Sequence, residues 1–80
     1  MKADYYLKMK GQNGRYWFTL CASNGQCIMV SETYQRAPWA LVARLANDLA
    51  GAAKAVKVTN ISSGEFPKDW AEMVEGVVYD

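Results

Sequence analysis

Two Asn-Gly pairs constrain the fold of this chain more than any other feature. Asn13-Gly14 and Asn24-Gly25 each lie between two runs of β-favouring residues, and the second pair sits within the apolar stretch 15–34. Asparagine and glycine tolerate the positive φ that tight hairpin turns require. We therefore expect three consecutive antiparallel strands joined by two short turns.

The first hairpin has a register that the turn and the apolar pattern both support. Residues 4–10 alternate in the period of two that is typical of a half-buried strand. A two-residue type I′ turn at Asn13-Gly14 predicts three opposed pairs on one face of the sheet: Met9 with Phe18, Leu7 with Leu20, and Tyr5 with Ala22.

The second hairpin allows two registers. A two-residue turn would set Leu20 opposite Met29 and turn Ile28 and Val30 away from the core. A three-residue loop with Gly25 in a bulge sets Leu20 opposite Ile28, and Phe18 opposite Val30. Because burial of one face fixes register, we expect the three-residue loop and this core face: Tyr5, Leu7, Met9, Phe18, Leu20, Ala22, Ile28 and Val30.

The opposite face of the predicted sheet is unusually apolar for a surface exposed to solvent. The same register assigns to it Tyr6, Lys8, Lys10, Trp17, Thr19, Cys21, Cys27, Met29 and Ser31. Cys21 and Cys27 become directly opposed neighbours, at a position where a strained bridge is conceivable. We expect two reduced thiols that act as small apolar side chains.

The rest of the chain predicts helices and one more strand. Residues 36–51 indicate a helix with Pro38 in its first turn, Gly51 as its C-terminal cap and an apolar stripe of Leu41, Val42, Leu45, Ala46 and Leu49. Trp39 is expected at the edge of that stripe or exposed. Residues 55–61 alternate as a short strand, and residues 67–75 read as a short amphipathic helix.

Together these elements predict an α+β fold. It is an antiparallel three- to four-stranded meander with one helix packed on one face and a short C-terminal helix. We expect one small domain over residues 1–80, with a body over residues 4–61 and a C-terminal amphipathic helix or tail over residues 62–80.

Composition argues against catalysis and against a membrane span. The chain has no histidine, which removes the commonest general base and the commonest metal ligand. The sequence shows no general base near either cysteine, and no spacing of Asp and Glu residues places two carboxylates side by side. We therefore expect that the protein is not an enzyme and has no catalytic residue, and we expect no metal and no cofactor. The N-terminus lacks the apolar core of a signal peptide, no apolar run reaches the ~20 residues of a membrane helix, and we expect a cytoplasmic protein.

The second hairpin resembles that of the YegP-like family of small bacterial domains. The shared pattern is Phe18-x-Leu20-x-Ala22-x-Asn24-Gly25-Gln26-x-Ile28 followed by Ser31-Glu32-x-Tyr34, and Tyr5-Tyr6 is similar as well. The resemblance covers roughly residues 4–34. It implies a β-β-β-α unit that occurs as tandem repeats or intertwined dimers, and it implies no activity or catalytic residue.

The chain departs from the family pattern in several places, among them Val42-Ala43-Arg44, where the family has an Asn-Gly-Ile segment. The helix opens with Arg36-Ala37-Pro38 where the family has a Ser-Lys pair. The second sheet face carries Trp17, Cys21, Cys27 and Met29 where the family is usually polar, and residues 66–80 have no clear counterpart.

These features predict a non-enzymatic protein–protein interaction module, expected to form a homodimer. Aromatic and long apolar side chains are the residues that dominate protein interfaces, and the expected partner-binding set is Tyr6, Trp17, Met29, Trp39, Phe66 and Trp70. A narrower alternative is a phage-encoded inhibitor that binds a host defence complex, in the manner of an anti-CRISPR protein.

A second alternative is binding of single-stranded nucleic acid. One sheet face interleaves aromatic rings with cations, a combination that stacks bases and contacts phosphates; its residues are Tyr6, Lys8, Lys10, Arg15 and Trp17. The charge distribution argues against this alternative, because residues 58–80 hold one Lys/Arg against five Asp/Glu, whereas residues 1–57 hold eight against three.

Overall fold

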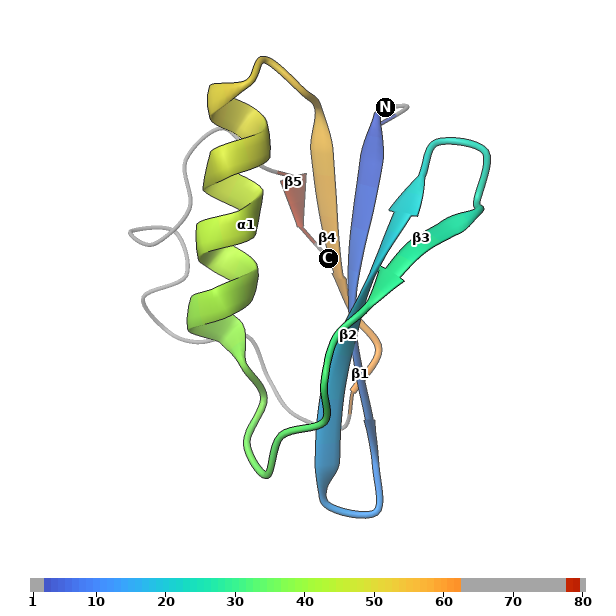
Figure 1. The fold of residues 1–80 in the computed structure, drawn as a ribbon, viewed down its shortest axis with the longest axis vertical. Coiled ribbons are helices and arrows are strands. Elements are labelled where there is room, and N and C mark those ends of the chain that lie inside the picture. Colours follow the sequence, from blue (N-terminus) through green and yellow to red (C-terminus); the bar gives the residue numbers. More distant parts are fainter. Residues whose placement is uncertain (1–2, 63–77, 80) are drawn as a thin grey trace.

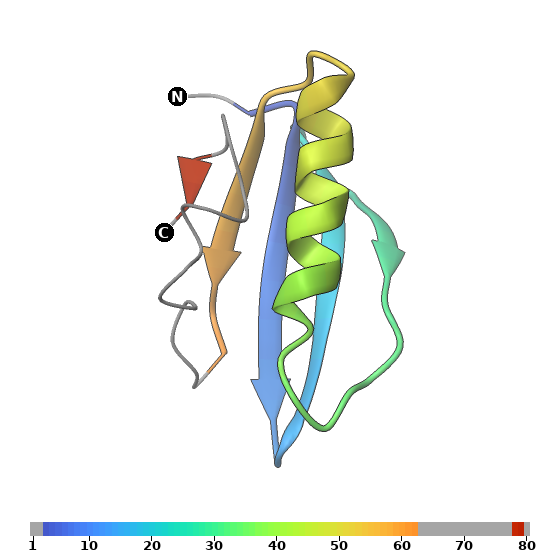
Figure 2. The ribbon, with the colours of Figure 1, turned by 90° about the vertical axis from the view of Figure 1, so that its left-hand side faces the viewer.

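A computed structural model describes residues 3–62 and 78–79 of the chain. Its elements are β1 (Tyr5–Gln12), β2 (Arg15–Ala22), β3 (Cys27–Val30), α1 (Trp39–Gly51), β4 (Val56–Asn60) and β5 (Val78–Tyr79). The strands form one sheet in the order β3-β2-β1-β4-β5. Helix α1 lies against one face of this sheet (Figures 1 and 2). The opposite face is not covered by any described helix or strand. The α+β fold and the single long helix are confirmed.

The first hairpin has the predicted turn and the predicted register. Asn13 and Gly14 both have positive φ, 53° and 73°, as a type I′ turn requires. The backbone pairs Met9 with Phe18 and Leu7 with Leu20. The pairing of Tyr5 with Ala22 follows in the same ladder, so local turn chemistry was sufficient to align β1 with β2.

The second hairpin begins as predicted and then changes register. The Ala22 carbonyl accepts a hydrogen bond from the Gly25 amide (2.9 Å), and the Ala22 amide donates to the Gln26 carbonyl (2.8 Å), which closes a three-residue loop. Gly25 has φ 87°, and Cys21 pairs with Cys27 as expected. A β-bulge then inserts Ile28, so that Leu20 pairs with Met29.

The bulge makes the prediction of a core face containing Ile28 and Val30 wrong. Val30 pairs with Thr19 rather than with Phe18. Ile28 and Val30 remain 57% and 63% exposed. Strand β3 lies at the edge of the sheet, where only one neighbour holds its register and bulges are common.

The antiparallel meander of β1, β2 and β3 is confirmed, but β4 joins the sheet by a crossover and does not continue that meander. It pairs with β1 in parallel, with Tyr5 opposite Val56 and Leu7 opposite Val58. Parallel neighbours need a long connection, and the chain between β1 and β4 runs through β2, β3 and α1, of which α1 makes the crossover from β3 to β4. At the end of the sheet where these two strands begin, the Ala55 amide donates to the Asp4 carboxylate (2.8 Å).

The core lies between α1 and the three longest neighbouring strands. Its buried residues are Leu7, Met9, Phe18, Trp39, Val42, Ala43, Ala46, Val56 and Val58. The buried side of the helix therefore follows Trp39, Val42, Ala43 and Ala46, the i, i+3, i+4, i+7 spacing of one helical face.

Three expectations about the helix need correction. Trp39 is buried in the core and only 8% exposed. The buried face of the helix includes the small residues Ala43 and Ala46 and is therefore rotated, relative to the predicted leucine stripe, toward Trp39. That rotation leaves Leu41 45% exposed, while Leu45 and Leu49 pack at the margin of the core. Gly51 is the last helical residue and no cap, since the positive φ after the helix belongs to Ala53 (61°).

The C-terminal region is described only at β5, which pairs in parallel with β4 through Lys57–Val78 and Val58–Tyr79. The predicted helix over residues 67–75, with Phe66 and Trp70, lies outside the described residues. Within residues 3–62 and 78–79, no helix has the length and apolar character that crossing a membrane requires.

Candidate functional site

The face of the sheet turned away from α1, hereafter the open face, brings the predicted nucleic-acid residues together. Successive strand residues point to opposite faces, and Leu7 and Phe18 point into the core. The pairing of Lys10 with Trp17 and of Tyr6 with Cys21 therefore places these side chains on the open face. Its residues on β1 and β2 are Tyr6, Lys8, Lys10, Arg15, Trp17, Thr19 and Cys21.

Strand β4 extends the open face with one cation that was not among the predicted site residues. Lys57 is paired with Tyr6, and Thr59 with Lys8. The alternation of Val56 and Val58 with Lys57 was visible in the sequence, but nothing local indicated that this strand is the neighbour of β1. The described part of the open face thus carries cations on three strands and no carboxylate.

The open face is a packed layer of side chains. Thr19 and Cys21 are only 3% and 1% exposed, although no described element lies over them. Tyr6, Lys8 and Trp17 around them are half-buried. Long side chains whose apolar stems lie along the surface shield smaller neighbours in this way while the charged ends stay in water. A ligand on this face would therefore contact aromatic rings and ammonium groups.

The edge strand β3 is the most exposed apolar segment of the described chain. Ile28, Met29 and Val30 are 57%, 40% and 63% exposed. Strand edges normally carry lysine, proline or a covering loop, because a free edge pairs with other strands. The four residues of β3 include no charged residue and no proline. This edge is hereafter the β3 edge.

Cys21 and Cys27 face each other across β2 and β3 with their sulfur atoms 2.7 Å apart. Cys21 is buried and Cys27 exposed, and both thiols are free. The hydrogen bond between the two thiols is the main cause that raises the pKa of the Cys27 thiol, and desolvation adds to it, while Lys10 and Lys8 act in the opposite direction. A thiol with a raised pKa is mostly protonated at neutral pH and is a poor catalytic nucleophile.

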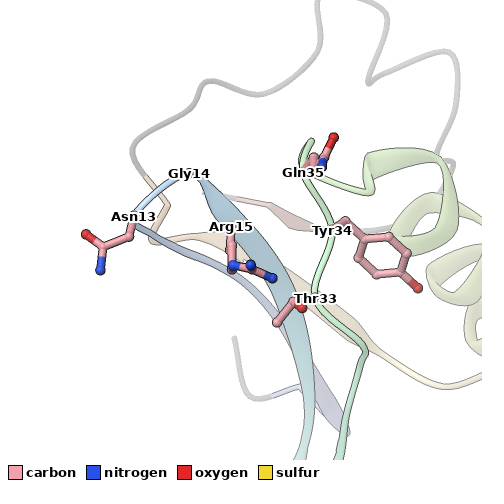
Figure 3. A pocket seen from close by; sticks show the side chains of 6 residues that line it. All are labelled: Asn13, Gly14, Arg15, Thr33, Tyr34 and Gln35. Carbon is pink, nitrogen blue, oxygen red and sulfur yellow. The ribbon is translucent and has the colours of Figure 1, made fainter.

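A polar pocket lies at the other end of the sheet, between the Asn13-Gly14 turn and the segment after β3 (Figure 3). It has a volume of about 550 Å³ and is lined by Asn13, Gly14, Arg15, Thr33, Tyr34 and Gln35. Two backbone hydrogen bonds between Tyr16 and Tyr34, 2.7 and 2.8 Å long, hold its walls together. Among the lining residues that the structure describes, Arg15 is the one with a charged side chain, and none of them is a general base.

The structure separates the residues that the sequence assigned to partner binding. Tyr6 and Trp17 lie on the open face. Met29 pairs with Leu20, so the bulge moves it from that face to the α1 side of the β3 edge. Trp39 lies in the core, which makes its assignment as an exposed contact wrong. Phe66 and Trp70 lie outside the described residues.

The side chains that could hold a metal do not gather in the described part of the chain. No group of three or more His, Cys, Asp or Glu residues lies close enough to bind an ion there. The sulfur pair of Cys21 and Cys27 would supply two ligands, fewer than the three or four of zinc sites.

One family comparison bears on this site. Residues 12–43 match the family described as a domain of unknown function, DUF1508. This is the family of the YegP-like domains, so the resemblance of the hairpin is confirmed. The matched segment runs from the Asn13-Gly14 turn through β3 into α1 and contains the whole β3 edge. No curated protein and no solved structure matches the chain.

Proposed function

We propose that the chain is a non-enzymatic protein-interaction module that acts in the cytoplasm and forms a homodimer through the β3 edge. The observation that carries the proposal is the run of three exposed apolar residues, Ile28 to Val30, on a strand that has a described strand on one side only. A second copy supplies a strand of matching length and character. Main-chain hydrogen bonds across the edge then extend the sheet, and alternate side chains pack against their counterparts.

Antiparallel pairing of β3 with the β3 of a second copy suits a two-fold dimer, in which the same surface is used twice. Like charges opposed across two strands are destabilising, and β3 has none. A strand of four residues buries little surface, and small interfaces are typical of weak, reversible complexes. We therefore expect a dimer that forms with rising concentration.

Size-exclusion chromatography with light scattering over a concentration series tests the homodimer. The wild-type mass should rise from 8.9 kDa toward twice that value. Val30→Lys should stay monomeric at every concentration, because it places a charge on each of the paired strands. The matched control is Leu41→Lys, which changes an exposed apolar residue of α1 and should associate like the wild type.

A wild-type chain that stays monomeric at high micromolar concentration would refute the homodimer. Loss of association in both lysine variants would also contradict the assignment to β3. If the wild type is monomeric, a foreign protein becomes the candidate for the β3 edge, including the host complex that a phage-encoded inhibitor would block. Circular dichroism of each variant checks that the fold is retained.

A second candidate function, binding of single-stranded nucleic acid, is favoured by the arrangement of the open face. Lys10 lies beside Trp17, and Lys57 beside Tyr6. Stacking of one base on an aromatic side chain contributes about 1–3 kcal/mol. Trp17→Ala should therefore weaken binding of a labelled oligonucleotide at least several-fold, and added salt should weaken it steeply.

Fluorescence anisotropy at low salt measures this binding. Arg44→Gln is the matched control, because Arg44 is an exposed cation of α1, on the far side of the sheet. A loss in Arg44→Gln as large as that in Trp17→Ala would show that binding is not confined to the open face. The absence of any binding by the wild type at low salt would end this second candidate.

A further inference from the structure

The opposed thiols of Cys21 and Cys27 are placed for a reaction that neither the fold nor the proposed function requires. They are direct partners in the β2–β3 ladder, and their sulfur atoms lie 2.7 Å apart. Directly opposed strand residues have Cα atoms about 4.5–5.5 Å apart, within the range of about 4.4–6.8 Å seen in disulfides. Since an S–S bond is about 2.05 Å long, the atoms need to approach by only roughly 0.7 Å.

We propose that Cys21 and Cys27 form a reversible intramolecular disulfide by exchange with a small-molecule disulfide, and that this bond fastens β3 to β2. The two sulfur atoms belong to one chain, so the bond does not depend on self-association. It would turn the exposed edge strand into one that is covalently held to its neighbour.

The reaction has a defined order because the two thiols differ in exposure. Cys27 is exposed, whereas Cys21 is 1% exposed and out of reach of a reagent. The Cys27 thiolate attacks the small disulfide, forms a mixed disulfide and expels one thiolate. The Cys21 thiolate then attacks the Cys27 sulfur and expels the second thiolate. One small disulfide is reduced to two thiols, and the protein dithiol is oxidised.

The loop between the two cysteines already has the conformation that the bond needs. Residues 23–25 are closed by the two hydrogen bonds of Ala22, and the Asn24 side chain accepts a further bond from the Gln26 amide (3.0 Å). Closing a loop that the native fold has already ordered mainly restricts the unfolded chain. The bond should therefore raise the melting temperature and slow fraying of β3.

Mass spectrometry after thiol alkylation tests the proposal. The reduced full-length chain is equilibrated with mixtures of reduced and oxidised glutathione at mildly alkaline pH, where more of the Cys27 thiol is ionised, and is then alkylated under denaturing conditions. We expect one transition from a doubly alkylated chain to an unalkylated monomer. The mass of that monomer should be two hydrogen atoms below the mass of the reduced, unalkylated chain. Peptide mapping should find Cys21 joined to Cys27.

Cysteine variants separate this reaction from simple modification. Cys21→Ala should accumulate a stable glutathione adduct on Cys27, because no second thiol resolves it. Cys27→Ala should remain unmodified while folded, because Cys21 is buried. The proposal is overturned if the wild type ends as a glutathione adduct, as an interchain disulfide on a non-reducing gel, or with both thiols still alkylated. The wild-type result decides even if a variant fails to fold.

Discussion

Replacing Trp39 with alanine is expected to destabilise the fold by about 3–5 kcal/mol, the usual cost of removing a buried aromatic side chain. Trp39 begins the buried face of α1 and contributes the largest side chain of the core. Small domains have a total stability of only about 5–15 kcal/mol, so this one change should remove a large part of it. Urea unfolding followed by circular dichroism measures the loss.

Trp17→Ala is the matched control for Trp39→Ala. Trp17 is half-buried on the open face, and we expect a cost of about 1 kcal/mol, typical of an ordinary substitution. The two variants remove the same side chain, so the difference between them reports its environment. Equal costs, or a larger cost for Trp17→Ala, would contradict the burial of Trp39 in the core.

Replacing Leu7 with alanine is expected to destabilise the fold by about 2–5 kcal/mol, whereas Ile28→Ala should change stability by no more than about 0.5 kcal/mol. Leu7 is fully buried beneath α1, and its removal leaves a cavity. Ile28 is the inserted residue of the bulge and is 57% exposed. Sequence pattern alone assigned both residues to one core face, so this pair tests the register of β3.

Thermal and urea unfolding of the two variants measure the difference in the free energy of unfolding. A loss for Ile28→Ala comparable to that of Leu7→Ala would restore the register in which Ile28 faces Leu20. Ile28→Ala also removes part of the β3 edge, so each variant is compared at a concentration where the wild type is monomeric. The comparison then reports folding without association.

The parts of the fold that the sequence predicted are those fixed by interactions between near neighbours. The first hairpin has a turn that only residues such as Asn13 and Gly14 form readily, and its apolar pattern agrees with that turn. The turn residues and the apolar pattern are independent of each other, and together they allow only one register of β1 against β2. The three-residue loop of the second hairpin was predictable for the same reason, as far as the pairing of Cys21 with Cys27.

The parts that could not be predicted depend on distant neighbours. The bulge at Ile28 follows from the position of β3 at the edge of the described sheet. Which strand lies at an edge depends on the order of all the strands, and the sequence of β3 does not contain that order. The parallel pairing of β4 with β1 depends on the path of α1 across the sheet. The phase of the helix depends on how closely Ala43 and Ala46 allow it to approach the strands.

The candidate site shows the same division. The positions of Tyr6, Lys8, Lys10, Arg15 and Trp17 on one face follow from the first hairpin alone and agree with the structure. Lys57 was missed because it reaches that face through the crossover. Trp39 was misassigned because the three leucines placed the centre of the predicted stripe at the margin of the buried helix face. Met29 moved to the α1 side of the sheet because of the bulge.

The parallel pairing of β1 with β4, next to the contact between Asp4 and Ala55, joins distant parts of the chain and is expected to form late during synthesis. The two residues are 51 positions apart, and pairings of such long separation form late because a long loop must first close. On the ribosome the two hairpins and the helix emerge before β4. Until that strand arrives, the nascent chain has one side of Leu7 and Met9 uncovered, and the protein is most vulnerable to misassembly in that interval.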